Sequence, residues 1–412
     1  MLSILVNAYA CAPFKGSEPG MGWNWIINMA KSCKLYIITE GEWKNDIEKI
    51  MKTLPERENI SFYYNPISEK IRKMCWNQGD WRFYYYYAKW QKEAYHIALD
   101  IMEHNKIDII HQLNMVGFRE PGYLWKIKDR PFVWGPIAGI GSIPVSYLKE
   151  ADFKFRIFFA LKNFISALQL RFSKRVVSAL RNASTVIVAT PEAKKAVYAY
   201  HGIKAIQINE TGCAIRTEEI RRPIVDEFHI LWVGRFIYTK QLKLALKVIA
   251  TLKHLKKIRF HIVGKAFNQK DTDKYKAYAS ATGIDELCIW HGEIPHHEVL
   301  SLMKQCDVFF FTSIFEATST VILEAIENQL PIVCFNTCGF GEIVDDSIGR
   351  KIELSDPSRS VLEFSEALRD MYENRGQLSC YSRNCIEKMR ECSWDAKMER
   401  LQLIYREALE NE

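Results

Sequence analysis

Residues 307–325 read DVFFFTSIFEATSTVILEA. The apolar run from Val308 to Phe311 is typical of a strand that is buried on both faces of a parallel sheet. The polar segment after it leads into a second apolar stretch, so it predicts a loop that opens a helix, and such loops in α/β proteins bind phosphorylated ligands. Glu316 and Glu324 add two carboxylates, whose oxygens can accept hydrogen bonds from sugar hydroxyl groups. The segment therefore predicts a site for a sugar nucleotide.

Length and composition favour two domains. The chain has 412 residues, of which 48% are hydrophobic, and chains beyond roughly 250–300 residues usually divide into domains. Eleven cysteines are scattered without a C-x-x-C pair, which predicts reduced thiols in a cytoplasmic protein. The start, from Leu2 to Cys11, resembles a short signal core, but it has no charged leader and runs into a glycine-rich segment, so it favours a first strand.

The charge is unevenly placed along the chain. Residues 1–222 hold 32 Lys and Arg against 21 Asp and Glu, a balance of +11, whereas the remaining residues hold 24 against 28, a balance of −4; together they give the net charge of +7. A basic half joined to a slightly acidic half indicates separate tasks, with the first half facing an anionic surface or substrate.

Apolar runs predict alternating strands and helices in both halves of the chain. In the first half we expect strands over residues 2–8, 35–39, 107–111, 132–134 and 185–189, with a helix over 23–30. In the second half we expect strands over residues 230–234, 260–264, 287–291, 308–312 and 332–335, with helices over 242–257 and 394–409. This alternation predicts an α/β protein of two doubly wound domains, 1–215 and 224–392, whose carboxyl edges face a central cleft. Residues 221–223 form the expected link, and residues 393–412 form a C-terminal helix that packs back on the first domain.

The segment from Gly234 to Lys240 follows a predicted strand and starts a helix. Arg235 and Lys240 would provide fixed positive charge where a diphosphate leaves, since Arg grips phosphate oxygens in two places and Lys adds a point charge. Two solvated charges at a helix start are the alternative. With two such cations available, we expect neither a metal nor another cofactor, and the pair Asp271 and Asp273 is better explained as a solvated charged loop.

Two glycine-containing segments are weaker signals. Gly16 to Gly22 holds three glycines, which let a backbone approach a ligand closely or simply make a tight turn. Cys338 to Glu342 follows the last predicted strand and would form either a backbone wall of the site or an ordinary turn.

Residues 153–185 contain seven basic residues and no Asp or Glu, and Phe158, Leu161, Ile165, Leu168 and Phe172 recur at helical spacing. Such a helix can lie on an anionic membrane, or it can face the core with a solvated basic side. The aromatic cluster from Trp81 to Tyr87 could stack on sugars, sit at a lipid interface or pack in the core. No nucleic-acid motif accompanies these aromatic residues, so we expect no nucleic-acid partner.

Together these motifs resemble the retaining glycosyltransferases of family 4, which have the GT-B fold of two Rossmann-like domains, and the resemblance covers nearly the whole chain. Gly234-Arg235 with Lys240 resembles the diphosphate clamp of that family, and Glu316 with Glu324 resembles its E-x7-E signature. Gly16 to Trp25, Val133 to Pro136 and Glu210 to Gly212 resemble segments of one bacterial branch.

The resemblance implies a role for each matched residue. Glu316, Arg235 and Lys240 would be catalytic. Donor-binding residues would be Gly234, Thr318, Ser319, Thr320, Val321, Glu324, Gly16 and Gly20. Glu18, His111 and Trp134 would lie on the acceptor side.

The chain departs from the family pattern at three positions. The second histidine of an H-x-H motif is Leu113, so a histidine that is merely satisfied at a strand end is the alternative for His111. Gln241 stands where a glycine often follows the clamp lysine, and residues 328–331 lack the glycine that often precedes the last strand.

These observations predict a retaining glycosyltransferase that moves a sugar from a nucleotide-sugar donor to a glycan or lipid-linked acceptor. It would act in surface polysaccharide assembly at the cytoplasmic face of a membrane, with a peripheral contact through residues 153–185. A sugar-nucleotide epimerase of the same fold and a non-catalytic glycan- or membrane-binding protein are the alternatives.

Overall fold

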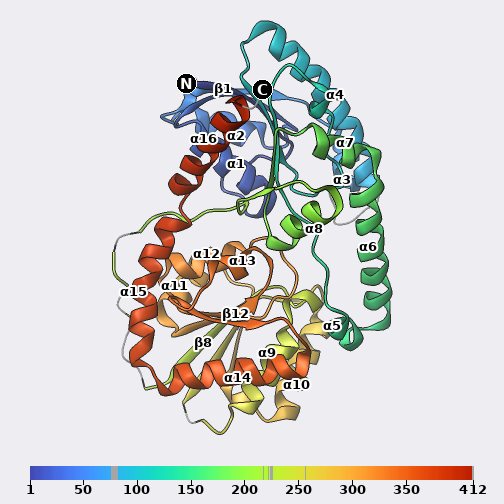
Figure 1. Cartoon of the computed structure of the whole chain (residues 1–412). Coiled ribbons are helices and arrows are strands. Elements are labelled where there is room, and N and C mark those ends of the chain that lie inside the picture. The colour runs from blue at the N-terminus through green and yellow to red at the C-terminus, as the bar shows by residue number, and fades with distance from the viewer. Residues whose placement is uncertain (76–81, 217, 221, 223–225, 256, 411–412) are drawn as a thin grey trace. The chain divides into compact units, whose positions relative to one another are not determined.

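The computed structural model describes residues 1–75, 82–216, 218–220, 222, 226–255 and 257–410. Its contacts group the chain into two compact units, coloured along the chain in Figure 1. The first unit comprises residues 1–140, 163–211 and 394–412, and the second comprises residues 141–162 and 212–393. Each unit is a Rossmann-like α/β domain built on one parallel sheet.

The first unit contains a seven-stranded sheet in the order β3-β2-β1-β4-β5-β6-β7. Its strands are β1 (Leu2–Ala8), β2 (Cys33–Thr39), β3 (Ile60–Tyr64), β4 (Ile109–Asn114), β5 (Phe132–Ile137), β6 (Thr185–Val188) and β7 (Ile206–Gln207). Its helices are α1 (Ser17–Met29), α2 (Lys44–Met51), α3 (Glu69–Cys75), α4 (Arg82–His104), α7 (Lys174–Asn182), α8 (Pro191–His201) and α16 (Trp394–Glu410).

Both faces of this sheet are apolar, because successive side chains of each strand point to opposite sides. Leu5 and Ile110 belong to a core that includes residues of α4, α7 and α8. Ile4 and Ile109 belong to a second core that includes residues of α1 and α16. Helices therefore cover the sheet on both sides, as a doubly wound fold requires.

The C-terminal helix α16 packs within the first unit, beside α1 (Figure 1, red). Tyr405 is fully buried, and the rings of Trp394 and Trp25 meet edge to face with centroids 6.1 Å apart. At the surface, Lys31 Nζ lies 3.0 Å from Asp395 Oδ1. Both a buried apolar face and polar contacts thus hold the helix in place.

The second unit contains a six-stranded sheet in the order β10-β9-β8-β11-β12-β13. Its strands are β8 (Phe228–Val233), β9 (Ile258–Val263), β10 (Cys288–Gly292), β11 (Val308–Phe311), β12 (Ile332–Asn336) and β13 (Gly349–Glu353). Its helices are α5 (Val145–Glu150), α9 (Leu242–Thr251), α10 (Gln269–Thr282), α11 (His296–Gln305), α12 (Thr320–Glu327), α13 (Cys338–Ile343), α14 (Pro357–Glu373) and α15 (Gly376–Glu391). Helix α6 (Phe153–Phe172) contributes residues to both units.

Both sheets place the first strand of the unit beside the fourth, in the order 3-2-1-4-5-6 of dinucleotide-binding folds. Ligands of such folds bind at the carboxyl ends of the strands where this order reverses. The reversal lies between β1 and β4 in the first unit and between β8 and β11 in the second.

The contacts divide the chain differently from the contiguous domains that we expected at 1–215 and 224–392. Residues 141–162 belong to the second unit, because Tyr147 of α5 is fully buried and donates a hydrogen bond to Ser360 (2.8 Å). Of the expected link, Arg221 and Pro223 lie outside the described residues. Arg222 donates hydrogen bonds to the carbonyl oxygens of Cys306 and Asn328, both at 2.7 Å.

Several expected elements have different bounds in the structure. Helix α1 starts at Ser17, so the presumed loop from Gly16 to Gly22 is mostly helical. Helix α9 ends at Thr251, because a turn leads to β9 through Lys257, whose φ is +75°. Strands β3, β7 and β13 were not predicted. Strand β7 has only two residues and β13 is polar, whereas β3 (Ile60–Tyr64) is mostly aromatic and apolar and was missed. No helix within the described residues is both long and apolar enough to cross a bilayer.

Gly264 lies where the ends of β8 and β9 approach each other closely. Its φ is +126°, and an added Cβ would lie 2.0 Å from the carbonyl oxygen of Gly234. We predict that Gly264→Ala lowers the free energy of unfolding by more than about 2 kcal/mol, because a backbone clash adds to the strain of the positive φ. Thermal unfolding would measure the change.

Gly292→Ala is the matched control for this substitution. Gly292 also has a positive φ (+69°), but nothing lies within 4 Å of an added Cβ, so only the backbone strain of about 1–2 kcal/mol is expected. Equal destabilisation in both variants would contradict the close approach of the two strands.

Candidate functional site

The reversal point of the second unit is built from the loops that follow β8 and β11. Trp232 Nε1–H donates to the hydroxyl of Thr312 at 3.0 Å, and that hydroxyl donates to the carbonyl oxygen of Lys240 at 2.8 Å. The backbone N–H of Ile314 donates to the carbonyl oxygen of Thr239 at 2.9 Å. The loops after β8 and β11 lie more than seventy residues apart in the sequence, and these bonds fix them against each other.

Lys240 and Glu316 meet at this point. The Lys240 ammonium lies 2.5 Å from Glu316 Oε1 and 5.0 Å from the centre of the Phe311 ring. Glu316 also accepts a hydrogen bond from Ser313 Oγ at 2.8 Å. Both side chains are largely shielded from solvent, although each keeps some exposed surface. The structure therefore brings together a cation and a carboxylate that the sequence presented as separate motifs.

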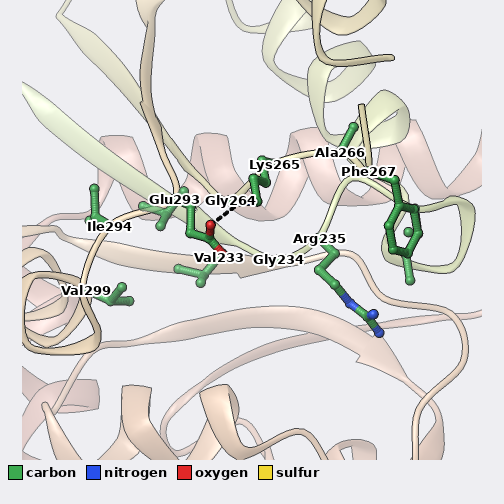
Figure 2. A pocket seen from close by; sticks show the side chains of 12 residues that line it. Val233, Gly234, Arg235, Gly264, Lys265, Ala266, Phe267, Glu293, Ile294 and Val299 are labelled. Carbon is green, nitrogen blue, oxygen red and sulfur yellow. Dashed lines mark ion pairs between the residues drawn. The ribbon is translucent and has the colours of Figure 1, made fainter. Parts of the chain in front are cut away.

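Gly234 and Arg235 line a pocket of about 330 Å³ at the carboxyl ends of β8, β9 and β10. The pocket is also lined by Val233, Ile237, Val263, Gly264, Lys265, Ala266, Phe267, Glu293, Ile294 and Val299. Figure 2 shows Arg235 and Phe267 at one end of the pocket, Ile294 and Val299 at the other, and an ion pair between Lys265 and Glu293. Arg235 and Phe267 are exposed. The pocket thus combines an apolar wall with an exposed guanidinium and an exposed aromatic ring.

The N-terminus of α12 lies directly after the Glu316 loop. Thr318 and Ser319 are buried, Thr320 is exposed, and Val321 is half-buried. Ser319 is the N-cap residue, but its side chain makes no capping hydrogen bond. Since the first N–H groups of a helix have no intrahelical acceptor, this end can offer hydrogen bonds to an anion.

Residues 338–343 form a wall beside the Glu316 loop. Cys338 Sγ accepts a hydrogen bond from the N–H of Glu316 at 3.3 Å, and the N–H of Gly339 donates to the carbonyl oxygen of Ala317 at 2.9 Å. The segment is the short helix α13 rather than a simple turn. It fixes the backbone that carries Glu316.

Glu324 has a partner that the sequence motifs did not predict. His296, the first residue of α11, places Nε2 at 3.1 Å from Glu324 Oε1. One turn later on α12, Glu327 accepts a hydrogen bond from the N–H of Ala214 at 2.7 Å, and burial raises its pKa. The only sequence signal for His296 as the partner of Glu324 is its position at a helix start, directly after Pro295.

Gln241 and Gln329 explain how the chain tolerates the loss of two glycines. Their φ values are +54° and +51°, the left-handed region that glycine adopts at little cost. Gln241 donates from Nε2 to the carbonyl oxygen of Tyr238 at 2.9 Å. Gln329 donates to the carbonyl oxygen of Glu218 at 2.6 Å and accepts from the N–H of Ile220 at 2.9 Å. Side-chain hydrogen bonds therefore stabilise both strained positions.

The reversal point of the first unit contains Glu18. Its carboxylate accepts a hydrogen bond from the N–H of Val116, which follows β4. Asn114 ties the two strand ends together, accepting from the N–H of Ala10 at 3.2 Å and donating to its carbonyl oxygen at 2.7 Å. Burial and the nearby Glu210 raise the pKa of Glu18 to about 7, while the bond from Val116 opposes the shift.

Gly16 and Gly20 also belong to the first unit, so the second unit's cluster does not include them. Gly16 is the N-cap residue of α1, and nothing lies within 4 Å of an added Cβ there. At Gly20 an added Cβ would lie 1.9 Å from the carbonyl oxygen of Lys15. Gly20 therefore serves a close backbone approach within its own helix start.

His111 and Trp134 are both buried, which argues against the acceptor-side contact that we expected of them. His111 Nε2–H donates to the carbonyl oxygen of Gly135 at 2.8 Å, and Nδ1 lies 2.6 Å from the Tyr405 hydroxyl. Burial lowers the pKa of His111 to about 4. A neutral ring with both nitrogens engaged fits the alternative of a satisfied strand-end histidine, and it links β4 to α16. Trp134 is part of the core against α4, α7 and α8.

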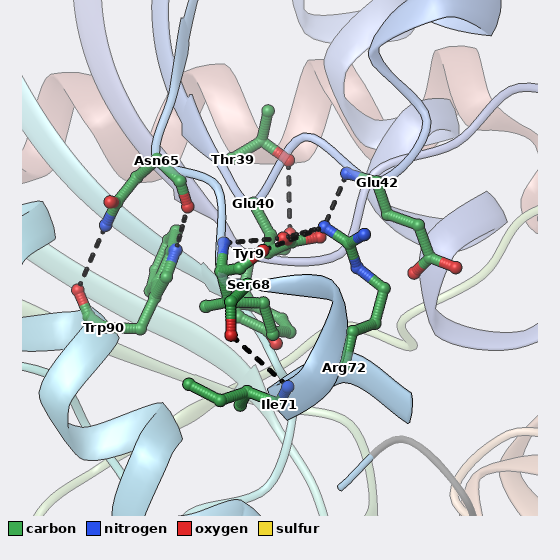
Figure 3. Close-up of polar contacts among 10 residues, drawn as sticks. Tyr9, Thr39, Glu40, Glu42, Asn65, Ser68, Ile71, Arg72 and Trp90 are labelled. Atoms are coloured by element: carbon green, nitrogen blue, oxygen red, sulfur yellow. Dashed lines mark hydrogen bonds and ion pairs between the residues drawn. The ribbon is translucent and has the colours of Figure 1, made fainter. Parts of the chain in front are cut away.

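A polar cluster closes the carboxyl edge of the first sheet near β2 (Figure 3). Glu40 is buried and accepts hydrogen bonds from the N–H groups of Glu42 and Ile67, both at 2.9 Å. It also pairs with Arg72 of α3. Nothing in the sequence marked Glu40, because a single Glu after a strand is common. The carboxylate is fully engaged, so we interpret the cluster as a brace for the loops around it.

The geometry of the second unit can be compared with known proteins. The family model described as Glycosyl transferases group 1 matches residues 216–391. The two Rossmann-like units have the GT-B architecture of glycosyltransferases.

Solved structures of low sequence identity share this fold over the whole chain. The apo form of the lipopolysaccharide outer core galactosyltransferase WaaB has a TM-score of 0.65 at 14% identity, covering 98% of this chain and 100% of its own. A glycosyltransferase from Rickettsia africae ESF-5 has a TM-score of 0.63 at 15% identity, covering 100% and 99%. HepE of Anabaena in complex with UDP and glucose has a TM-score of 0.61 at 13% identity, covering 98% and 99%. No curated protein matches the chain by sequence.

The raised pKa of Glu18 predicts a pH-dependent contribution to stability. The folded protein holds a proton at Glu18 that the unfolded chain releases between pH 4.5 and about 7, so this group's contribution to the free energy of unfolding falls as pH rises through that range. We expect Glu18→Gln, which stays neutral, to gain stability over the parent protein as the pH is raised from 4.5 to 8. Thermal unfolding of both proteins across this range would show it.

Glu93→Gln, which removes an exposed carboxylate of α4, is the control for loss of one surface charge. A stability difference between Glu18→Gln and the parent protein that stays constant from pH 4.5 to 8 would contradict the raised pKa.

Proposed function

We propose that this protein is a retaining glycosyltransferase that moves a sugar from a nucleotide-sugar donor to a glycan or lipid-linked acceptor in surface polysaccharide assembly. The observation that carries the proposal is the meeting of Lys240 and Glu316 where the strand order of the second unit reverses. The donor would bind to the second unit. The site would work in the cytoplasm, at the inner face of a membrane, with an anionic surface contacted through residues 153–185.

Similar structures support the choice of substrate class. HepE has been solved with UDP and glucose and with UDP-glucose, and WaaB is named as a galactosyltransferase of the lipopolysaccharide outer core. WaaG, with a TM-score of 0.57, is described as a glycosyltransferase of lipopolysaccharide biosynthesis. We propose the same general class for this chain, a nucleoside diphosphate sugar as donor and a growing glycan as acceptor.

In the proposed reaction, the bond between the sugar and the diphosphate breaks, and the diphosphate gathers negative charge as it departs. Lys240, Arg235 and the first N–H groups of α12 would stabilise that charge, since preorganised donors act most strongly on charge that develops in the transition state. Glu316 would contact the donor sugar. It also holds the Lys240 ammonium at 2.5 Å, which would position this cation for the diphosphate.

Two cations and a helix N-terminus could neutralise a diphosphate without a metal ion. We therefore propose a metal-independent transfer, in which the acceptor oxygen bonds to the anomeric carbon on the face that the diphosphate leaves, and the acceptor hydroxyl gives its proton to the departing phosphate. Glu324 would bind the ribose hydroxyl groups, with His296 orienting its carboxylate from 3.1 Å. The pocket beside Gly234 would take the base.

Removal of either charged group at the centre of the site should abolish transfer. We predict that Lys240→Ala or Glu316→Ala lowers the transfer rate by at least about 10²-fold, because each removes an interaction that matters most in the transition state. Lys243→Ala and Glu342→Ala, which remove exposed charges nearby, should leave the rate within about twofold. Near-normal transfer in either site variant, with unfolding temperatures unchanged, would refute the assigned roles.

The donor and the stereochemistry of transfer can be determined in two steps. A panel of UDP-, GDP- and ADP-sugars would be screened by thermal stabilisation, since a bound ligand raises the unfolding temperature. Proton NMR of the product would then give the anomeric configuration, and inversion would contradict the retaining mechanism. Conversion of the donor without any acceptor would favour the epimerase instead.

Phe267 offers a separate test of the base pocket. Its exposed ring lines the pocket together with Arg235, and stacking of a base on an aromatic side chain is worth about 1–3 kcal/mol. We predict that Phe267→Ala weakens binding of the donor nucleotide by about tenfold or more, measured by calorimetry. Phe14→Ala, which removes an exposed ring of the first unit, is the control. Unchanged affinity in the Phe267 variant would place the base elsewhere.

A further inference from the structure

Helix α6 carries an unusual concentration of exposed apolar side chains. Twenty large hydrophobic side chains of the described chain are exposed, and eight of them lie on this one helix, from Phe153 to Phe172. Their exposed fractions run from 41% to 71%. Phe158, Leu161 and Phe172 therefore do not pack in the core. Of the two interpretations of their helical spacing, the core-facing helix is excluded for these side chains.

The exposed side chains form one continuous face. At about 100° per residue, all eight fall within an arc of roughly 140° around the helix axis. Phe159 and Leu170, which project to the opposite side, are buried. The helix is thus held by one apolar face and presents a second one, about 30 Å long, to its surroundings.

The charged side chains of α6 itself are all basic. Residues 153–191 contain no Asp or Glu. Lys154, Arg171, Lys174 and Arg181 are exposed, and no ion pair holds them within the part of the chain that the structure describes. The other cations are engaged: Arg156 donates to the carbonyl oxygen of Lys149 at 2.7 Å, and Arg175 donates to Glu120 at 2.8 Å.

We infer that α6 is a membrane-docking helix, which lies in the plane of an anionic bilayer surface with its exposed face among the acyl chains near the headgroups. Burial of that face removes apolar surface from water, and the basic side chains meet the negative headgroups. Lys154 and Arg171 lie within the arc of the apolar face, and their long side chains can reach back to the headgroups. The inference names the surface on which the proposed reaction would take place, but its test needs no sugar transfer.

The charge selects lipid over a second copy of this chain as the occupant of the face. Two copies that met through α6 would bring their basic side chains together, and like charges in contact oppose association. An anionic surface supplies the complementary charge. A contiguous apolar patch rimmed by polar residues is otherwise unusual on a protein that acts alone.

The full chain would be sedimented with vesicles of phosphatidylcholine alone and with vesicles that contain phosphatidylglycerol as well. We expect binding to the anionic vesicles to exceed binding to the neutral vesicles by about tenfold or more, and to fall as NaCl is raised from about 0.1 to 0.5 M. The variant Phe158→Ser/Leu161→Ser/Phe164→Ser should lose at least about tenfold in binding. Lys154→Gln/Lys174→Gln removes two of the four exposed cations and should weaken the salt-sensitive part of the binding.

Leu362→Ser/Leu403→Ser is the matched control, because these leucines of α14 and α16 are 62% and 56% exposed and lie on other helices. The control should bind vesicles like the parent protein, and all variants should keep the unfolding temperature, since only exposed side chains change. Equal binding of the Phe158 variant and the parent, or equal binding to neutral and anionic vesicles, would overturn the inference. Dimerisation of the parent protein that the Phe158 variant abolishes, seen by light scattering, would assign the face to a second copy instead. Thermal stabilisation by nucleotide sugars, unchanged in the Phe158 variant, would separate this outcome from the proposed function.

Discussion

The placement of Lys240 against Glu316 depends on the hydrogen bonds that join the loops after β8 and β11. Thr312 receives the Trp232 N–H and donates to the Lys240 carbonyl oxygen, so one hydroxyl links the core of the sheet to the backbone of the lysine. A second hydrogen bond, from the Ile314 N–H to the Thr239 carbonyl oxygen, joins the backbones of the same two loops. Strands β8 and β11 are adjacent because the strand order reverses between them. The same sheet topology therefore brings the loops that carry Lys240 and Glu316 together.

The backbone of this site is strained in places, and side chains compensate. At Gln241 and Gln329 the chain adopts φ values of +54° and +51° without the glycines that would make them easy. A left-handed non-glycine residue costs about 1–2 kcal/mol, and hydrogen bonds from both glutamine side chains offset part of that cost. The loops after β8 and before β12 can therefore keep their course without glycine at these two positions. Departures from a motif thus need to be judged by conformation as well as by identity.

The sequence predicted the central strands of both sheets, but it could not predict the contacts among the candidate site residues. Runs such as Val308 to Phe311 are buried on both faces, so their composition alone identifies them. Strand β13 could not be found in this way, because Arg350, Lys351 and Glu353 make it polar at the sheet edge. The sequence left His111 open between an acceptor-side residue and a satisfied histidine at a strand end. Its partner Tyr405, which decides between them, lies 294 residues away, so no local pattern could reveal it. The same limit applies to His296 beside Glu324.

Helix α6 shows why periodicity leaves the direction of an apolar face undecided. A helical repeat of Phe and Leu indicates only that one side of the helix is apolar. That side can be buried either in the protein core or in a lipid surface. Here Phe159 and Leu170 already bury one side, so the repeat from Phe153 to Phe172 must face away from the protein. Residues 153–191 contain no Asp or Glu, so the segment that carries this apolar face has a net positive charge. The candidate donor site lies in the second unit, so a bound diphosphate does not explain the excess of basic residues in the first half of the chain, whereas the proposed anionic surface would.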